Sequence, residues 1–191
     1  MGTTVGARER RPAGCFRSGA SLGYTLRLQQ VLSSDTTTKA KVDAMANFED
    51  CVRFANQHMI CSIATCDREQ PRVRMLGMWF ADTRGFYFST VKTKKIFQEL
   101  TANRRAEVCF YAPPRGPLGQ EGSTDIGTMM RASGDVVFLD DPNLKERLLA
   151  ERPFLRPHAD DQAIFRIQNG EATFWTSADS GRESALERIR F

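Results

Sequence analysis

Histidine is scarce in this sequence, and its scarcity limits the chemistry that the chain can perform. Of 191 residues, only His58 and His158 are histidines, and neither lies beside a recognisable nucleophile motif. A zinc site would have to use Cys61 and Cys66, which have no second ligand pair nearby. We therefore expect no metal site and no Ser/His or Cys/His catalytic pair, and we interpret these two cysteines as buried thiols in a strand.

Long apolar runs are also missing. No stretch approaches the roughly 20 apolar residues that a membrane-spanning helix requires, so we expect no membrane insertion. The five cysteines are odd in number and lack the dense spacing of a secreted disulfide scaffold, which favours a reducing compartment. The sequence thus indicates a cytoplasmic protein with one domain large enough for a hydrophobic core.

The positive charge of the chain is concentrated at one end. The formal net charge is +4, and residues 1–45 hold seven basic and three acidic residues, which leaves 20 of each sign in the remaining 146. Arg84-Gly85-Phe86-Tyr87-Phe88 partly matches an RNA-recognition strand, but Tyr87 replaces the small residue of that motif. A neutral remainder is also a poor footprint for nucleic acid, so we expect no nucleic-acid partner.

Residues 1–45 differ from the rest of the chain. They are rich in Ser, Thr, Gly and Arg and show no sustained apolar period, so they bury too little surface to offset the entropy of ordering. We expect a disordered N-terminal extension over 1–45 and a folded domain over 46–191. The Arg-rich, acid-poor composition also fits a transit peptide, and Met45 could be a functional start.

Residues 46–191 alternate short strands with a few helices. Helix starts are predicted near Asn47, Thr93 and Asp141, and 112–127 is predicted to be an exposed loop of open purpose. Asn169-Gly170 predicts a tight hairpin between its two flanking strands. The predicted strands are 60–66, 72–80, 86–90, 106–111, 128–139, 164–168 and 171–176. This order favours a mainly β, α+β fold with an antiparallel sheet or barrel of six to seven strands and flanking helices.

The cluster Lys92-Thr93-Lys94-Lys95 lies where a predicted strand leads into a helix. Cations at a helix N-terminus oppose the helix dipole, so the cluster makes sense if an anion such as phosphate binds there. Arg72 and Arg74 could add a bidentate guanidinium if their strand pairs with 86–90. The alternatives are a solvated basic turn and an exposed sheet face that carries two arginines.

The order of motifs resembles the pyridoxamine 5′-phosphate oxidase family. The resemblance runs from about Asn47 to Phe191, and each motif alone is weak, whereas their order and spacing are more specific. The segments that carry it are Pro71-Arg72-Val73-Arg74-Met75-Leu76, Gly85-Phe86-Tyr87-Phe88-Ser89-Thr90, Lys94-Lys95-Ile96, Ala106-Glu107-Val108-Cys109-Phe110, Arg131-Ala132-Ser133-Gly134-Asp135-Val136 and Phe174-Trp175.

This resemblance implies an FMN-binding split β-barrel that works as a homodimer with flavin at the interface. Arg74, Lys94 and Lys95 would hold the flavin phosphate. The other implied cofactor-binding residues are Met75 and Leu76, through backbone groups on the isoalloxazine ring, Phe88 and Ser89 beside the flavin, and Trp175 from the other subunit.

The sequence also departs from the true oxidases of this family. Trp79 stands where they carry a Lys a few residues after the phosphate-binding Arg. Their substrate-phosphate set of Tyr, Arg and Ser has no counterpart in 144–152, and 180–183 lacks their Arg-x-His. The resemblance therefore implies a retained flavin site and a lost vitamin-phosphate site.

We accordingly expect a flavin-dependent oxidoreductase that acts on an unknown small molecule, with NADH or NADPH as a candidate electron donor. No catalytic acid or base can be assigned from the residues. The alternatives are a non-catalytic flavin- or haem-binding protein and a relative that uses a deazaflavin.

Overall fold

The computed structural model describes Gly2, residues 46–117 and residues 124–191. The predicted extension over 1–45 and the centre of the 112–127 loop therefore lie outside the described residues. The helices are α3 (Phe48–Gln57), α4 (Lys95–Ala102) and α5 (Pro142–Glu151), with short 3-10 turns η1 (Pro153–His158), η2 (Ser177–Asp179) and η3 (Glu183–Ala185). None of these helices is long and apolar enough to cross a membrane.

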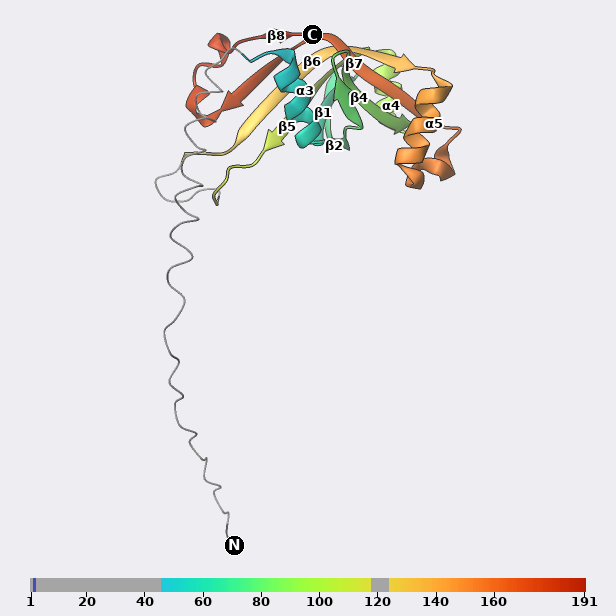
Figure 1. The fold of residues 1–191 in the computed structure, drawn as a ribbon, viewed down its shortest axis with the longest axis horizontal. Coiled ribbons are helices and arrows are strands. Elements are labelled where there is room, and N and C mark those ends of the chain that lie inside the picture. Colours follow the sequence, from blue (N-terminus) through green and yellow to red (C-terminus); the bar gives the residue numbers. More distant parts are fainter. Residues whose placement is uncertain (1, 3–45, 118–123) are drawn as a thin grey trace, which may run out of the picture. The chain divides into compact units, whose positions relative to one another are not determined.

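Eight antiparallel strands form one sheet in the order β2-β1-β5-β6-β7-β4-β3, with β8 added to β7 (Figure 1). Figure 1 shows α5 at one end of this sheet. The α+β class with an antiparallel sheet and flanking helices is confirmed. The strands are β1 (Ile60–Asp67), β2 (Gln70–Gly77), β3 (Phe80–Asp82), β4 (Gly85–Val91), β5 (Arg105–Ala112), β6 (Thr128–Leu139), β7 (Gln162–Thr176) and β8 (Ile189–Arg190).

The predicted helix starts are close to those observed. Asn47 forms a capping box with Asp50 at the start of α3, and Asp141 accepts from the backbone N–H groups of Asn143 and Leu144 at the start of α5. Helix α4 begins at Lys95, two residues after the predicted start, and Lys94 is its N-cap.

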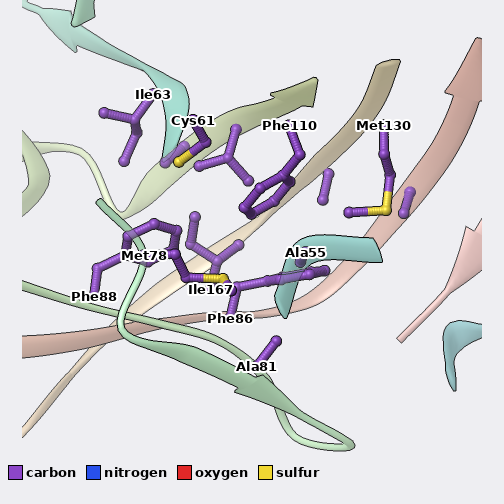
Figure 2. Close-up of a cluster of buried hydrophobic side chains, with 14 of the residues drawn as sticks. Ala55, Cys61, Ile63, Met78, Ala81, Phe86, Phe88, Phe110, Met130 and Ile167 are labelled. Carbon is purple, nitrogen blue, oxygen red and sulfur yellow. The ribbon is translucent and has the colours of Figure 1, made fainter. Parts of the chain in front are cut away.

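The sheet curls around one hydrophobic core. Alternate residues of β1, β5 and β6 point inward, and they meet the inward aromatic residues of β4 and β7. Figure 2 shows this cluster, in which Cys61 of β1 lies beside Phe110 of β5, and the Phe86 ring of β4 lies 5.6 Å from the Phe110 ring. A second, smaller cluster joins Trp79, Tyr87, Leu148 and Ile164 where α5 packs on the sheet.

The predicted strand over 72–80 was wrong, because the chain breaks it into two. β2 ends at Gly77 and pairs with β1, whereas β3 begins at Phe80 and pairs with β4. The pairing with 86–90 that would have carried Arg72 and Arg74 toward the lysine cluster therefore does not form. β2 and β4 are separated by four strands in the sheet order, so any link between Arg74 and the lysine cluster must come from α4.

The predicted Asn169-Gly170 hairpin was wrong as well. β7 continues through both residues and pairs with β6 on either side of them, over 164–168 and 171–176, and the register shifts between Ser133 and Asp135. Asn169 has a φ of 51°, so the pair forms a bulge that bends a long strand. A Cβ on Gly170 would lie 1.8 Å from the carbonyl oxygen of Ser133, which explains why this position is glycine.

Candidate functional site

Arg74 lies in a small polar cluster inside the curled sheet. β2 places Arg74 opposite Ile63 of β1, so its side chain shares the inward face with Thr65. The Nη1 atom of Arg74 donates to Glu99 Oε2 at 2.7 Å and to Thr65 Oγ1 at 3.2 Å. Thr65 in turn donates its hydroxyl to Glu99 Oε2 at 2.5 Å. One carboxylate oxygen of α4 thus accepts hydrogen bonds from both β1 and β2.

Glu99 is ionised in this cluster. Its side chain is only 6% exposed, and burial alone raises the pKa of a carboxyl group. Hydrogen bonds from Arg74 and Thr65, together with the charges of Arg74 and Arg72, outweigh burial and lower the pKa of Glu99 below its ordinary value. The cluster therefore holds a carboxylate next to the predicted phosphate-binding arginine.

Sequence reasoning missed Glu99. Its signal was an acidic residue between Ile96 and Leu100 on the buried face of α4, where an apolar residue is expected. A carboxylate on such a face requires a cationic partner, but the sequence does not show that Arg74 supplies it.

The lysine cluster remains open at the start of α4. Lys92, Lys94 and Lys95 are exposed, and none of them forms an ion pair with another described residue. Lys94 is the N-cap but makes no side-chain capping hydrogen bond. The Phe97 N–H donates to the Lys94 carbonyl oxygen at 3.0 Å, whereas the N–H groups of Lys95 and Ile96 have no backbone acceptor among the described residues. Two lysines and two free backbone donors therefore lie at the same end of α4, which is the composition of an anion site.

Helix α4 connects this open end to Arg74. Glu99 lies one turn after Lys95, and residues four apart are neighbours on one side of a helix. The contact between Glu99 and Arg74 thus brings the arginine to the helix that begins with the lysines. Arg72 does not join the cluster, because it pairs with Asp67 at 3.4 Å and is half exposed.

The residues predicted to contact the flavin ring lie on different faces of the sheet. Met75 is 65% exposed on the outer face, where it neighbours Ser62, whereas Leu76 points inward and packs on the core. Phe88 is fully buried and stacks on Phe165, with 5.2 Å between the ring centroids. The Phe88 ring is therefore a core residue.

Two further predicted residues are only partly covered. Ser89 on β4 is half-buried and lies opposite Ile164. Trp175 is half-buried on β7 opposite Met129, and alternation along the strand places it on the outer face. In a single subunit Trp175 does not belong to the Arg74 cluster, and its predicted role across a subunit interface stays a prediction.

Trp79 has a structural role that the sequence did not reveal. It is 3% exposed, and its indole Nε1 donates to Glu151 Oε2 of α5 at 2.7 Å. The guanidinium of Arg147 lies over the ring, 5.1 Å from its centroid. The position that the resemblance assigns to a lysine is thus occupied by an indole that docks α5.

An open cavity of about 700 Å³ lies elsewhere on the sheet. Its lining includes Thr65 of β1, Asn103 at the C-cap of α4, Arg105 of β5, Glu171 of β7 and Arg190 of β8. None of the predicted flavin-binding residues lines it. Thr65 alone connects this cavity with the Arg74 cluster.

The cysteines described by the structure are free, and no group of three or more His, Cys, Asp or Glu in the described residues could hold a metal ion. Burial raises the pKa values of the Cys51 and Cys61 thiols to about 12. These thiols are protonated and inert at neutral pH. The interpretation of Cys61 as a buried strand thiol is thus confirmed, whereas Cys66 on the same strand is only partly buried.

Comparison with known proteins places the chain in a family. The family described as pyridoxamine 5′-phosphate oxidase matches residues 48–176, and the chain belongs to this family. Two relatives, both named pyridoxine/pyridoxamine 5′-phosphate oxidase, come from Anaeromyxobacter dehalogenans and Alkalilimnicola ehrlichii. The first is 36% identical over 80 residues, which cover 39% of this chain and 40% of the relative. The second is 30% identical over 145 residues, which cover 70% and 72%.

A solved structure supports the fold. A NimC/NimA family protein from Clostridium acetobutylicum is similar with a TM-score of 0.56 at 23% identity, covering 75% of this chain and 91% of that protein. The antiparallel sheet with flanking helices is thus the split barrel of the family.

Proposed function

We propose that this protein binds FMN and catalyses a redox reaction on a small molecule, as a homodimer with flavin at the subunit interface. The observation that carries the proposal is the anion site at the start of α4, where Lys94 and Lys95 have no ion pair in the described part of the chain. The family membership supports the phosphate group of a flavin as the anion that binds there.

The donor set fits a phosphate group. It offers two ammonium groups, unpaired helix N–H groups and the guanidinium of Arg74, which uses only Nη1 for its contacts with Thr65 and Glu99. Bound FMN would supply hydride chemistry, and the protein would supply binding and orientation. Arg74, Lys94 and Lys95 would hold the phosphate, and the outer face around Met75 and Trp175 would cover the ring.

Pyridoxamine 5′-phosphate is not the substrate we propose. The relatives carry that activity in their names, but Trp79 is buried against Glu151 here, so no ammonium group is present at that position. Helix α5 also argues against this substrate. Its Arg147 is already engaged within the protein, because it lies over the rings of Trp79 and Phe80 and pairs with Glu151.

The visible spectrum of the purified full chain tests the proposal. We expect a flavin spectrum as isolated, or uptake of added FMN with quenching of its fluorescence. Lys94→Ala combined with Lys95→Ala should weaken FMN binding, whereas Lys145→Ala on α5 should not. A colourless protein that also fails to take up FMN would contradict the proposal.

The same spectrum distinguishes the other cofactors, because haem and deazaflavin absorb differently from FMN. Reduction of the bound flavin by NADH or NADPH, followed by turnover with an acceptor, would distinguish an enzyme from a flavin store. A flavin that stays oxidised with both donors and turns over no acceptor would favour the store.

A further inference from the structure

The Arg74 guanidinium is held on one side only. Its Nη1 atom contacts Glu99 and Thr65, whereas Nη2 and Nε have no hydrogen-bond partner among the described residues. A guanidinium is planar, so fixing one nitrogen fixes the direction of the other donors. The half-buried side chain, 29% exposed, thus has one bound edge and one available edge.

Glu99 is the main partner of the bound edge of Arg74, because its Oε2 atom accepts from Arg74 Nη1 at 2.7 Å. A carboxylate that is 94% covered would be unfavourable alone, and here both of its contacts converge on Oε2. Thr65 holds this oxygen from β1 at 2.5 Å, so the carboxylate is itself fixed.

We propose that Glu99 is a positioning residue, which together with Thr65 orients Arg74 toward the phosphate group of a flavin nucleotide. This inference rests on the proposed function and deepens it. Glu99 touches neither the flavin ring nor the substrate. Through Arg74 it raises the affinity for FMN relative to riboflavin, which has the same ring and no phosphate.

Titration of the full chain with FMN and with riboflavin, followed by flavin fluorescence, tests this inference. Glu99→Ala should weaken FMN binding about tenfold, in the range found when a supporting partner of a binding residue is removed. Riboflavin affinity should stay unchanged, because Arg74 does not contact the ring. The matched control is Gln98→Ala, a neighbouring exposed position on α4.

Conservative variants separate positioning from a general structural effect. Glu99→Gln keeps an acceptor oxygen for Arg74 and Thr65, so it should restore most of the FMN affinity. Thr65→Val removes the hydrogen bonds that Thr65 makes with Glu99 and Arg74 but keeps the contact between Glu99 and Arg74. It should therefore cause a smaller loss than Glu99→Ala, again for FMN alone. These two variants keep the test informative if Glu99→Ala does not fold.

Two results would overturn the inference while the proposed function survives. Equal losses for FMN and riboflavin would mean that Glu99 only maintains the fold. Tighter FMN binding by Glu99→Gln or Glu99→Ala would mean that the carboxylate repels the phosphate. A wild-type protein that is folded and binds no FMN would instead overturn the proposed function, and the inference with it.

Discussion

The indole nitrogen of Trp79 donates a hydrogen bond of 2.7 Å to the Glu151 carboxylate, and this contact joins the segment between β2 and β3 to the end of α5. Arg152, the next residue, donates to the carbonyl oxygen of Met78 at 2.6 Å. Arg147 lies over both Trp79 and Phe80. The C-terminal half of α5 is therefore held to the segment 78–80 by contacts of Arg147, Glu151 and Arg152.

Truncation of Trp79 should destabilise the protein strongly. Trp79→Ala removes a buried ring from the smaller core cluster, and loss of a buried aromatic ring costs about 3–5 kcal/mol of the free energy of unfolding. Trp79→Phe keeps most of the buried area and loses only the N–H donor to an exposed carboxylate, so its cost should be a small fraction of that. Urea unfolding of both variants measures the difference.

Phe154→Ala is the matched control for this comparison, because Phe154 on η1 is 72% exposed and its removal should leave the urea midpoint unchanged. Equal losses for Trp79→Phe and Trp79→Ala would show that the hydrogen bond to Glu151, and not ring burial, holds α5.

Much of the fold follows from local patterns, and the hairpin predicted at Asn169-Gly170 was wrong because a local pattern could not decide it. Helix caps at Asn47 and Asp141 depend on neighbouring residues alone, so the sequence predicts them correctly. Asn169-Gly170 permits a positive φ, which suits a hairpin turn and a bulge equally. Only the pairing of β6 with β7 on both sides of Asn169-Gly170 decides between them, and that pairing is a tertiary contact.

Substitution at this bulge should be severe. Gly170→Ala would place a Cβ 1.8 Å from the Ser133 carbonyl oxygen, so β6 and β7 would have to separate. We expect a loss of about 3 kcal/mol or more, as for other large backbone clashes. Gly77→Ala is the control, since its nearest atom would be the Ile60 side chain at 3.8 Å. Thermal unfolding measures both, and an unchanged midpoint for Gly170→Ala would contradict the bulge.

The candidate site was predictable only where charge alone revealed it. Lys94 and Lys95 were found because three cations at a helix start conflict with the helix dipole. Glu99 was missed because its partner Arg74 is 25 residues away and on another strand. The sheet order that brings α4 to β1 and β2 does not follow from any local pattern.

The outer face of β1 and β2 should form the subunit contact of the proposed homodimer. Ile60, Val73 and Met75 are each at least 65% exposed there, on a strand pair at the edge of the sheet. Exposed apolar side chains that gather in this way are typical of an interface. Met75→Glu should therefore convert a dimer to a monomer in sedimentation experiments at micromolar concentration.

Phe154→Glu provides the comparison for that experiment, because it also puts a carboxylate at an exposed apolar position, but on η1. It should leave the oligomeric state unchanged. A wild-type protein that sediments as a monomer, or a Met75→Glu variant that remains a dimer, would count against an interface on this face.

Glu99 should make the stability of the protein depend on pH in a defined direction. Its pKa in the folded state lies below the ordinary value of 4.5 through the contacts with Arg74 and Thr65. A lowered folded-state pKa adds stability above the unfolded-state pKa, and this stability is lost as the pH falls through the folded-state value. Glu99→Gln, which cannot ionise, should therefore be less stable than the wild type at pH 7.

The difference in the free energy of unfolding between the wild type and Glu99→Gln should stay constant from pH 7 to about pH 5 and shrink below about pH 4.5, as the unfolded chain begins to take up the proton. Urea unfolding of both proteins at a series of pH values measures this difference, and subtraction removes the acid effects that they share. Glu146→Gln, at an exposed position on α5, should show no such change. If the difference between the wild type and Glu99→Gln grew as the pH fell, the carboxyl group would be stabilised in its protonated form, and the ion pair with Arg74 would not hold it.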